Sequence, residues 1–281
     1  MSVFDILEAM PNRVLALAEV VGSEGVVPRE ELARRIVPGV ESLDQFKNLL
    51  RESLRLGVVI DDKVSGGIRL SDDIAPKQLR ERKKFVATCL NALIPNEGDC
   101  DEGNKTYSRA LAWLLTRPIG LNLEAGGEFQ TALSRDLEGP EIYDLTNASR
   151  SSMLIYWAHF MGFTEWIVLD GKSYCNPDPT RAMAAAIKNI IEKKHATPVA
   201  EFFQRLGREV PVFETGRIRK EVEDRLKKPR DETFISQSSS LALARLEDRG
   251  AIKIEPLADA PTLLMVGMDN EQRPISHITL L

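Results

Sequence analysis

Three stretches of the chain share one pattern, in which helically spaced apolar residues run into a glycine and then into an apolar segment. They are SLDQFKNLLRESLRLGVVI (42–60), SMLIYWAHFMGFTEWIVLD (152–170) and LALARLEDRGAIKIE (241–255). Apolar residues three and four positions apart predict a helix, glycine accepts the left-handed backbone that ends a helix, and short β-branched runs predict strands. Each stretch therefore predicts a helix, a glycine stop and a strand.

The first of these stretches completes a recognisable order of elements. Two shorter helices are predicted before it, and Phe46, Leu49 and Leu50 give its helix an apolar face that ends at Gly57. The segments VVIDD and IRLSDD then predict two strands around the turn KVSGG. Three helices and a two-stranded wing are the order of a winged helix-turn-helix domain, which we predict for residues 1–75.

The other two stretches predict two further modules of the same kind. A middle domain over residues 76–195 begins with an amphipathic stretch at 76–95, includes a hairpin with Asp170-Gly171 at its turn, and ends in a connector helix. A C-terminal winged-helix domain over residues 196–281 has the segments AIKIEPL and PTLLMVGM as its wing. The predicted fold class is mostly α with small β wings, in tandem winged helix-turn-helix modules.

The composition limits the kinds of binding surface and structural site that the chain can have. The 281 residues carry a net charge of −5, so a surface that faces DNA must be a local patch. Three cysteines without C-x-x-C spacing argue against a disulfide framework and a structural zinc site. Because the sequence shows no signal peptide and no apolar run of about 18 residues, we expect no membrane segment and a cytoplasmic location.

The third helix of the first module supplies the first candidate DNA contacts. We expect Lys47, Asn48 and Arg51 to reach base edges or phosphates, and Lys63 and Arg69 on the wing to contact the backbone of double-stranded DNA. Against this, winged-helix domains also bind proteins, and acidic residues on the same helix would repel phosphate.

The strongest basic segment lies in the last module. Between residues 205 and 230, nine Lys and Arg face five Asp and Glu. A serine-rich helix start follows, whose hydroxyls and N-terminus are suited to phosphate. The candidate DNA contacts here are Arg217, Arg219, Lys220, Lys227, Lys228, Ser238 and Arg245. The alternative interpretation is a solvated face of alternating charge.

Catalytic motifs are missing from the sequence. It contains no phosphate-binding loop, no dinucleotide-binding glycine motif, no H-E-x-x-H and no nucleophile elbow, and its strand-poor pattern provides no parallel sheet for such a site. We therefore expect a non-catalytic protein without a metal or a small-molecule cofactor.

The order of segments also carries a resemblance. The segments YWAHFMGF and NPDPT, followed by VPVFETGRIRKEVEDR before the last module, resemble DpdG-like proteins, accessory proteins of bacterial systems that place 7-deazaguanine derivatives in DNA and restrict phage. The resemblance covers most of the chain. It implies a defence-associated partner of larger helicase-like or nuclease-like subunits, and no catalytic residues.

Three functions remain open at this point. The first is a non-catalytic DNA-binding subunit of an anti-phage complex. The second is an adaptor whose winged helices bind partner subunits without reading DNA, which the unusually apolar helix of the middle module favours. The third is a transcription regulator, for which a dimer and a palindromic site are expected.

Overall fold

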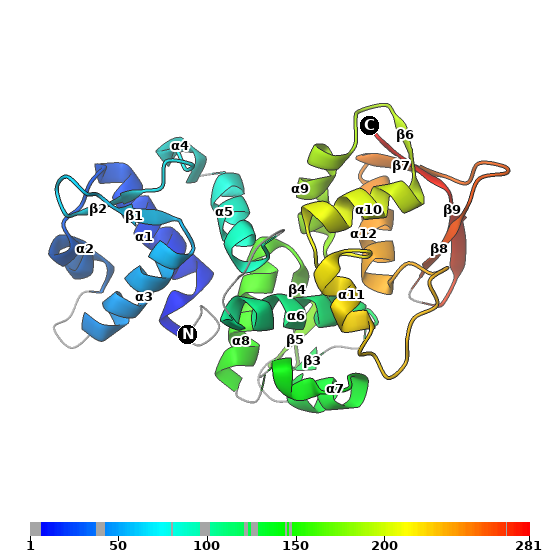
Figure 1. Ribbon diagram of the computed structural model, residues 1–281, viewed down its shortest axis with the longest axis horizontal. Helices are drawn as coiled ribbons and strands as arrows, with labels where there is room; N and C mark the ends of the chain where they lie inside the picture. Colours follow the sequence, from blue (N-terminus) through cyan, green and yellow to red (C-terminus); the bar gives the residue numbers. More distant parts are fainter. Residues whose placement is uncertain are drawn as a thin grey trace. The chain divides into compact units, whose positions relative to one another are not determined.

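The computed structural model divides into two compact units, residues 1–105 and 106–281 (Figure 1). The residues that it describes are 7–37, 43–79, 81–95, 102–120, 123–124, 129–143, 145, 148–267 and 269–281. Both units are helical with small antiparallel sheets. The sequence pattern predicts three modules; in the structure, the residues predicted to form the last two belong mainly to one unit.

The first unit begins with three helices and a hairpin. Its elements are η1 (Leu7–Ala9), α1 (Pro11–Glu24), α2 (Arg29–Ile36), α3 (Leu43–Arg55), β1 (Val59–Asp61), β2 (Ile68–Leu70), α4 (Pro76–Leu79) and α5 (Lys83–Leu93), followed by the start of α6 (Glu102–Thr116). The predicted order of three helices and two antiparallel strands is confirmed, and its interpretation as a winged helix stays a prediction.

The junction between α3 and β1 shows why the sequence pattern switches there. Phe46, Leu49 and Leu50 are buried on the inner side of α3. Gly57 follows with a φ of 67°, a conformation that glycine adopts without steric strain. The chain then reverses, and Val59 pairs with Leu70 in an antiparallel ladder.

The predicted amphipathic helix at 76–95 is divided into α4 and α5. Arg82 precedes α5 with a φ of 57°, so the backbone cannot continue as one right-handed helix through this point. Phe85, Cys89 and Leu93 are buried along α5, as the helical spacing indicates.

The second unit opens with a helical layer around a three-stranded sheet of order β3-β5-β4. Its elements, after the end of α6, are β3 (Leu123–Glu124), α7 (Phe129–Asp136), η3 (Pro140–Tyr143), α8 (Ala148–Met161), β4 (Thr164–Leu169) and β5 (Lys172–Pro177). The predicted hairpin turn is confirmed, because Asp170 and Gly171 both have positive φ between paired strands. The apolar face of α8 is buried: Ile155 and Ala158 are at most 1% exposed.

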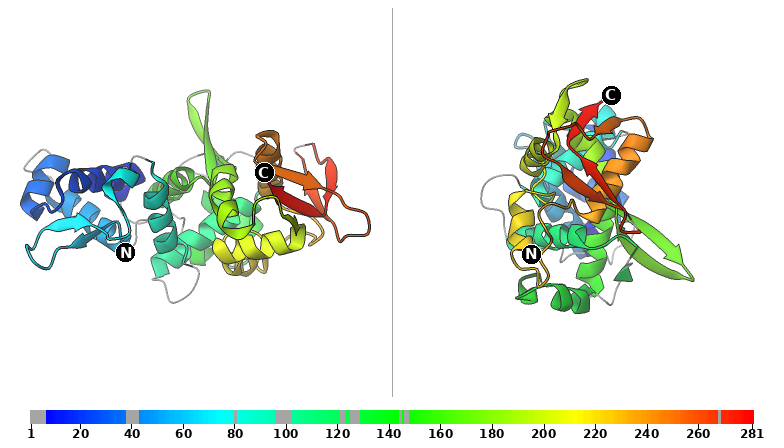
Figure 2. Two further views of the ribbon diagram at one scale, coloured as in Figure 1. Left: turned by 90° about the horizontal axis from the view of Figure 1, so that it is seen from above. Right: turned by 90° about the vertical axis from the view of Figure 1, so that its right-hand side faces the viewer.

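The described part of the rest of the second unit contains four helices and two small sheets. Its elements are α9 (Thr180–Ile190), β6 (Ala196–Pro198), α10 (Val199–Glu209), α11 (Arg217–Glu223), α12 (Gln237–Asp248), β7 (Ile252–Glu255), β8 (Leu263–Val266), β9 (Gln272–Ile275) and β10 (His277–Leu280). Figure 2 shows β7 beside β10 and the hairpin of β8 and β9.

The predicted pairing of the last wing is wrong. The strand β7 pairs with β10, not with β8, and β8 pairs with β9. Ile252 and Ile254 point toward the core from β7. They lie opposite Leu280 and Ile278, so the pairing buries the apolar residues of both strands. Among the described residues, no helix is long and apolar enough to cross a membrane.

Candidate functional site

The candidate DNA contacts on α3 are engaged with neighbours on the same helix. Lys47 forms an ion pair with Asp44 at 3.0 Å. Arg51 donates to Asn48 Oδ1 at 3.2 Å and lies 3.3 Å from a carboxylate oxygen of Glu52. These cations are exposed, but each has a local acidic or amide partner that lowers its availability to phosphate.

On the β1–β2 hairpin of the first unit, the candidate Arg69 also has acidic neighbours. Arg69 donates to Asp72 at 2.6 Å and lies 3.7 Å from Asp62, while Lys63 is exposed in the β1–β2 turn. The hydrogen bond from Arg69 lowers the pKa of Asp72, so this acid stays ionised at neutral pH. Residues 1–75 contain thirteen Asp and Glu against nine Lys and Arg, which makes this part of the chain acidic.

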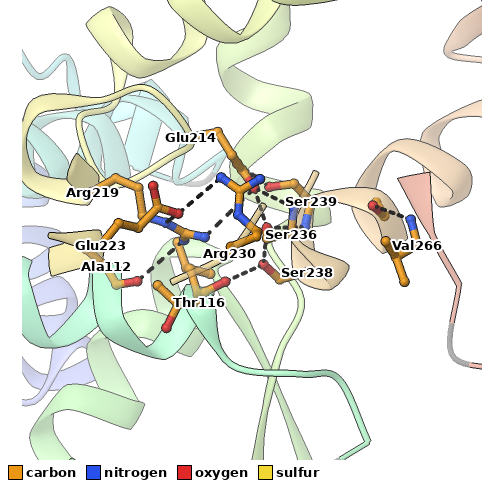
Figure 3. A network of polar contacts seen from close by, with 12 residues as sticks. Ala112, Thr116, Glu214, Arg219, Glu223, Arg230, Ser236, Ser238, Ser239 and Val266 are labelled. Carbon is orange, nitrogen blue, oxygen red and sulfur yellow. Dashed lines mark hydrogen bonds and ion pairs between the residues drawn. The ribbon is translucent and has the colours of Figure 1, made fainter. Parts of the chain in front are cut away.

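The serine-rich start of α12 faces the interior (Figure 3). Ser236 Oγ donates to Glu214 and caps the helix, and Ser239 Oγ donates to the other carboxylate oxygen of Glu214 at 2.6 Å. Ser238 Oγ donates to the carbonyl of Leu115 at 2.7 Å. A buried carboxylate of the chain therefore already satisfies this helix N-terminus.

Two predicted DNA contacts are accordingly reassigned to the interior. Ser238 is fully buried, and its hydroxyl is used by Leu115. Arg219 is 1% exposed; it donates to Glu223 at 2.8 Å and to the carbonyl of Ala112 at 3.5 Å. Neither side chain can reach the surface of a duplex in this conformation.

The remaining candidates of the second unit lie at the surface. Arg245 is half-exposed and is held by the buried carboxylate of Asp178. Arg217 and Lys220 are exposed on α11, and Lys227 and Lys228 follow that helix. Of these residues, only Lys227 and Lys228 line a pocket of the second unit.

A pocket of about 680 Å³ lies where α6, α7, α11 and the start of α12 meet. We call it the basic pocket. Its lining residues are Thr116, Arg117, Pro118, Arg135, Asp136, Arg219, Glu223, Leu226, Lys227, Lys228, Arg230, Phe234, Ile235, Ser236, Gln237 and Val266. Six of them are cationic and two are acidic, so the lining has four positive charges in excess within a chain of net charge −5.

Each acid of the basic pocket is shared between arginines. Glu223 accepts from Arg219 at 2.8 Å and from Arg230 at 3.2 Å. Burial alone would raise the pKa of Glu223, but the two guanidinium groups outweigh burial and lower it. Glu223 is therefore ionised at neutral pH and orients both arginines.

Arg117 is held in a similar way, by Asp136 and by an aromatic ring. It forms an ion pair with Asp136, which also accepts from Trp113 Nε1 at 3.2 Å. Its guanidinium carbon lies 5.4 Å from the centre of the Trp113 ring, in cation–π contact. Burial lowers the pKa of Arg117 below its ordinary value, and Asp136 opposes that effect.

Three guanidinium nitrogens of the basic pocket have no hydrogen-bond partner in the part of the chain that the structure describes. They are Nε of Arg117, Nη2 of Arg219 and Nε of Arg230; the second lies 3.9 Å from Glu214 Oε1, beyond hydrogen-bond distance. Arg117 is 6% exposed and Arg219 1%, so water has little access to them. Buried donors without an acceptor are rare in proteins, which marks this wall as a candidate anion site.

Metal and thiol chemistry find no support among the described residues. No group of three or more His, Cys, Asp and Glu side chains within them is arranged to hold a metal ion. Burial raises the pKa of Cys175 to about 12, and Cys89 is buried as well. Cys100 lies outside the described residues.

The sequence predicted three of the six cations of the basic pocket as contacts. The three that it missed are Arg117, Arg135 and Arg230. Lys227 and Lys228 were predicted as contacts, and Arg230 belongs to the same basic segment. Arg117 and Arg135 each lie at the end of a helix, where a cation is commonly explained by the helix dipole, and nothing in the local sequence relates them to residues about a hundred positions later.

Comparison with known proteins identifies a family. A model of the DpdG-like family matches residues 1–260. Searches among curated proteins and among solved structures found no match.

Proposed function

Because the chain belongs to the DpdG-like family, we propose that it is a non-catalytic, DNA-binding subunit of a bacterial DNA-modification and phage-defence system. The observation that carries the DNA-binding part is the charge of the basic pocket. Its rim residues Arg135, Lys227 and Lys228 are exposed, and the pocket has four positive charges in excess. Exposed cations around a recess provide contacts to phosphate without base readout.

The second unit is a better candidate than the first for contact with DNA phosphates. Among the described residues, no acidic partner is paired with Lys228, and Lys227 donates to the carbonyl of Ser134 at 2.7 Å, which leaves its charge uncompensated. The cations of α3 and the wing, by contrast, have acidic neighbours. In this proposal the first unit, as a winged helix, adds at most a secondary contact through Lys47 and Arg51.

A duplex titration with matched charge reversals tests the proposal. The double variant Lys227→Glu/Lys228→Glu is compared with Arg34→Glu/Arg35→Glu, whose residues are exposed on α2 of the first unit. Both variants change the net charge equally, so a difference between them reports position. We expect fluorescence anisotropy with labelled duplex to show weakened binding only for the first variant. Between about 50 and 200 mM salt, its slope of log K against log salt should also fall by about 0.9 for each lost contact.

Two results would count against DNA binding at the rim. One is the absence of binding to any duplex at low salt, where phosphate contacts are strongest. The other is equal weakening by both double variants, which would indicate a response to net charge alone.

A second function, contact with a larger subunit, is favoured by the hairpin of β4 and β5. Near its turn, Ile167, Val168 and Leu169 are 39%, 67% and 55% exposed. The hairpin projects from the second unit in Figure 2 (green, left view). Three consecutive exposed apolar residues at a strand end are typical of a surface that a partner covers.

Co-purification with the products of neighbouring genes tests this second function. We expect Val168→Ser/Leu169→Ser to release the partner, while Val64→Ser, at a 96% exposed position of the β1–β2 turn, retains it. Retention of the partner by the hairpin variant would exclude the hairpin as the contact.

A further inference from the structure

The buried wall of the basic pocket is arranged differently from its rim. Its three unpaired guanidinium nitrogens come from the end of α6, from α11 and from the segment before α12. In Figure 3, Arg219 and Arg230 lie on either side of Glu223. The three arginines that carry these nitrogens line the same recess, and several guanidinium N–H donors at one place are suited to a tetrahedral oxyanion.

A phosphate group fits the chemistry of this wall better than a carboxylate of the chain. Asp136 and Glu223 already accept from the other nitrogens of these arginines, so the unpaired donors need additional acceptor oxygens. A phosphate has three or more oxygens and a larger negative charge, which the excess positive charge of the pocket balances.

Part of the lining of the same pocket is apolar. Pro118, Leu226, Phe234 and Val266 contribute this surface, and Phe234 is partly exposed. A volume of about 680 Å³ lies in the range of small-molecule sites and is several times the size of a phosphate ion. A flat, apolar group attached to the phosphate would fill it, and a nucleobase stacks on an aromatic ring in this way.

We propose that the basic pocket binds a nucleotide, with the phosphate on Arg117, Arg219 and Arg230 and the base on the side of Phe234. The arginines are held in place before binding, since Trp113 and Asp136 fix Arg117 and Glu223 fixes the other two. Such preorganisation reduces the entropy lost on binding. The proposal concerns the buried wall, so it is tested separately from duplex binding at the rim.

Two sources supply this ligand chemistry, a free nucleotide and the phosphorylated end of a DNA strand. Isothermal titration of the full chain with deoxyadenosine 5′-monophosphate, deoxyadenosine and inorganic phosphate tests the first. A short single strand with a 5′-phosphate, compared with the same strand carrying a 5′-hydroxyl, tests the second. We expect the nucleotide or the phosphorylated strand to bind at least about tenfold tighter than its counterpart without phosphate, and tighter than inorganic phosphate.

Variants identify the site. Arg230→Gln, at a 28% exposed position, should weaken nucleotide binding about tenfold, and Phe234→Ala should weaken it while leaving inorganic phosphate binding unchanged. Arg249→Gln, at an exposed position at the end of α12, is the matched control and should bind as the unaltered chain does. If Arg230→Gln does not fold, judged by circular dichroism, Phe234→Ala locates the site on its own.

The following results would overturn the proposal. One is that neither the nucleotide nor the phosphorylated strand binds at millimolar concentration. Another is that removal of the phosphate leaves the affinity of both unchanged. Binding that is unchanged in Arg230→Gln, or in Phe234→Ala where Arg230→Gln does not fold, would place the nucleotide elsewhere. Equal affinity for inorganic phosphate and nucleotide would remove the role given to the apolar wall.

Discussion

Ser239 Oγ donates a hydrogen bond of 2.6 Å to Glu214 Oε2, and both residues are almost completely buried. The same carboxylate accepts from the backbone N–H of Ser236 at 3.2 Å. Glu214 thereby holds the start of α12 to the loop after α10. Its removal would leave several buried donors without an acceptor.

We expect Glu214→Ala to lower the free energy of unfolding by about 3 kcal/mol, because those donors lose their acceptor and the buried Arg219 loses a nearby negative charge. Glu214→Gln keeps one acceptor oxygen and should cost roughly half as much. Urea denaturation followed by circular dichroism measures both. Glu232→Ala, at an exposed position, is the control; an equal effect at the two positions would show that the Glu214 contacts add no stability.

Glu223 should make stability depend on pH. Its pKa is below the ordinary value of 4.5 in the folded chain, because Arg219 and Arg230 outweigh the effect of burial. A carboxyl group with a lowered pKa stabilises the fold above its unfolded pKa, and this contribution is lost as the pH falls from about 4.5 through the folded pKa. Urea denaturation at neutral pH and in that acidic range should show the loss.

The variant Glu223→Gln cannot ionise, so its stability should change less over the same acidic range. Glu232→Gln changes an exposed carboxyl to the same amide and serves as the comparison. A pH dependence in Glu223→Gln as steep as that of the unaltered chain would assign the effect to other acids.

The close approach of Gly207 and Gly216 permits no side chain. A Cβ at Gly216 would lie 2.3 Å from the carbonyl oxygen of Pro211, and one at Gly207 would lie 2.5 Å from the backbone nitrogen of Gly216. We expect Gly216→Ala to destabilise the second unit by about 3 kcal/mol, seen as a lower Tm. Gly267→Ala, whose Cβ would meet its nearest atom at 3.6 Å, should change the Tm little. Similar Tm values for the two variants would contradict the steric argument.

The thiol of Cys175 should be unreactive in the folded chain. The residue is fully buried on the central strand β5, and burial raises its pKa to about 12. Since only the thiolate reacts, iodoacetamide near pH 8 should modify Cys175 only after denaturation. Peptide mass spectrometry identifies the modified residue. Modification of the native protein at the rate of the unfolded chain would show that the strand opens readily.

The local pattern predicts most elements of this fold because local interactions determine them. The hairpin at Asp170-Gly171 and the helix that ends before Gly57 depend on neighbouring residues. The pairing of β7 was mispredicted because apolar alternation does not specify a partner: Ile254 would fit either β8 or β10 by pattern, and only the packed structure selects Ile278.

The candidate site was less accessible to prediction for the same reason. Lys227 and Lys228 belong to a basic segment that composition reveals. Ser238 and Arg219 were predicted to lie at the surface. The sequence of a serine-rich helix start, or of a helix that carries an arginine, does not show whether the side chain faces solvent or a buried acid. Glu214, which determines the environment of Ser236 and Ser239, is more than twenty positions away in the sequence.

The position of β10 has a consequence for the order in which the second unit acquires its structure during synthesis. β10 is the central strand of its sheet, paired with β6 on one side and β7 on the other. Those neighbours do not pair with each other, so on a ribosome they have no sheet to join until residue 280 has been made and has left the exit tunnel. A nascent chain stalled earlier would leave the edges of β6 and β7 without the strand that joins them, and unpaired strand edges promote aggregation.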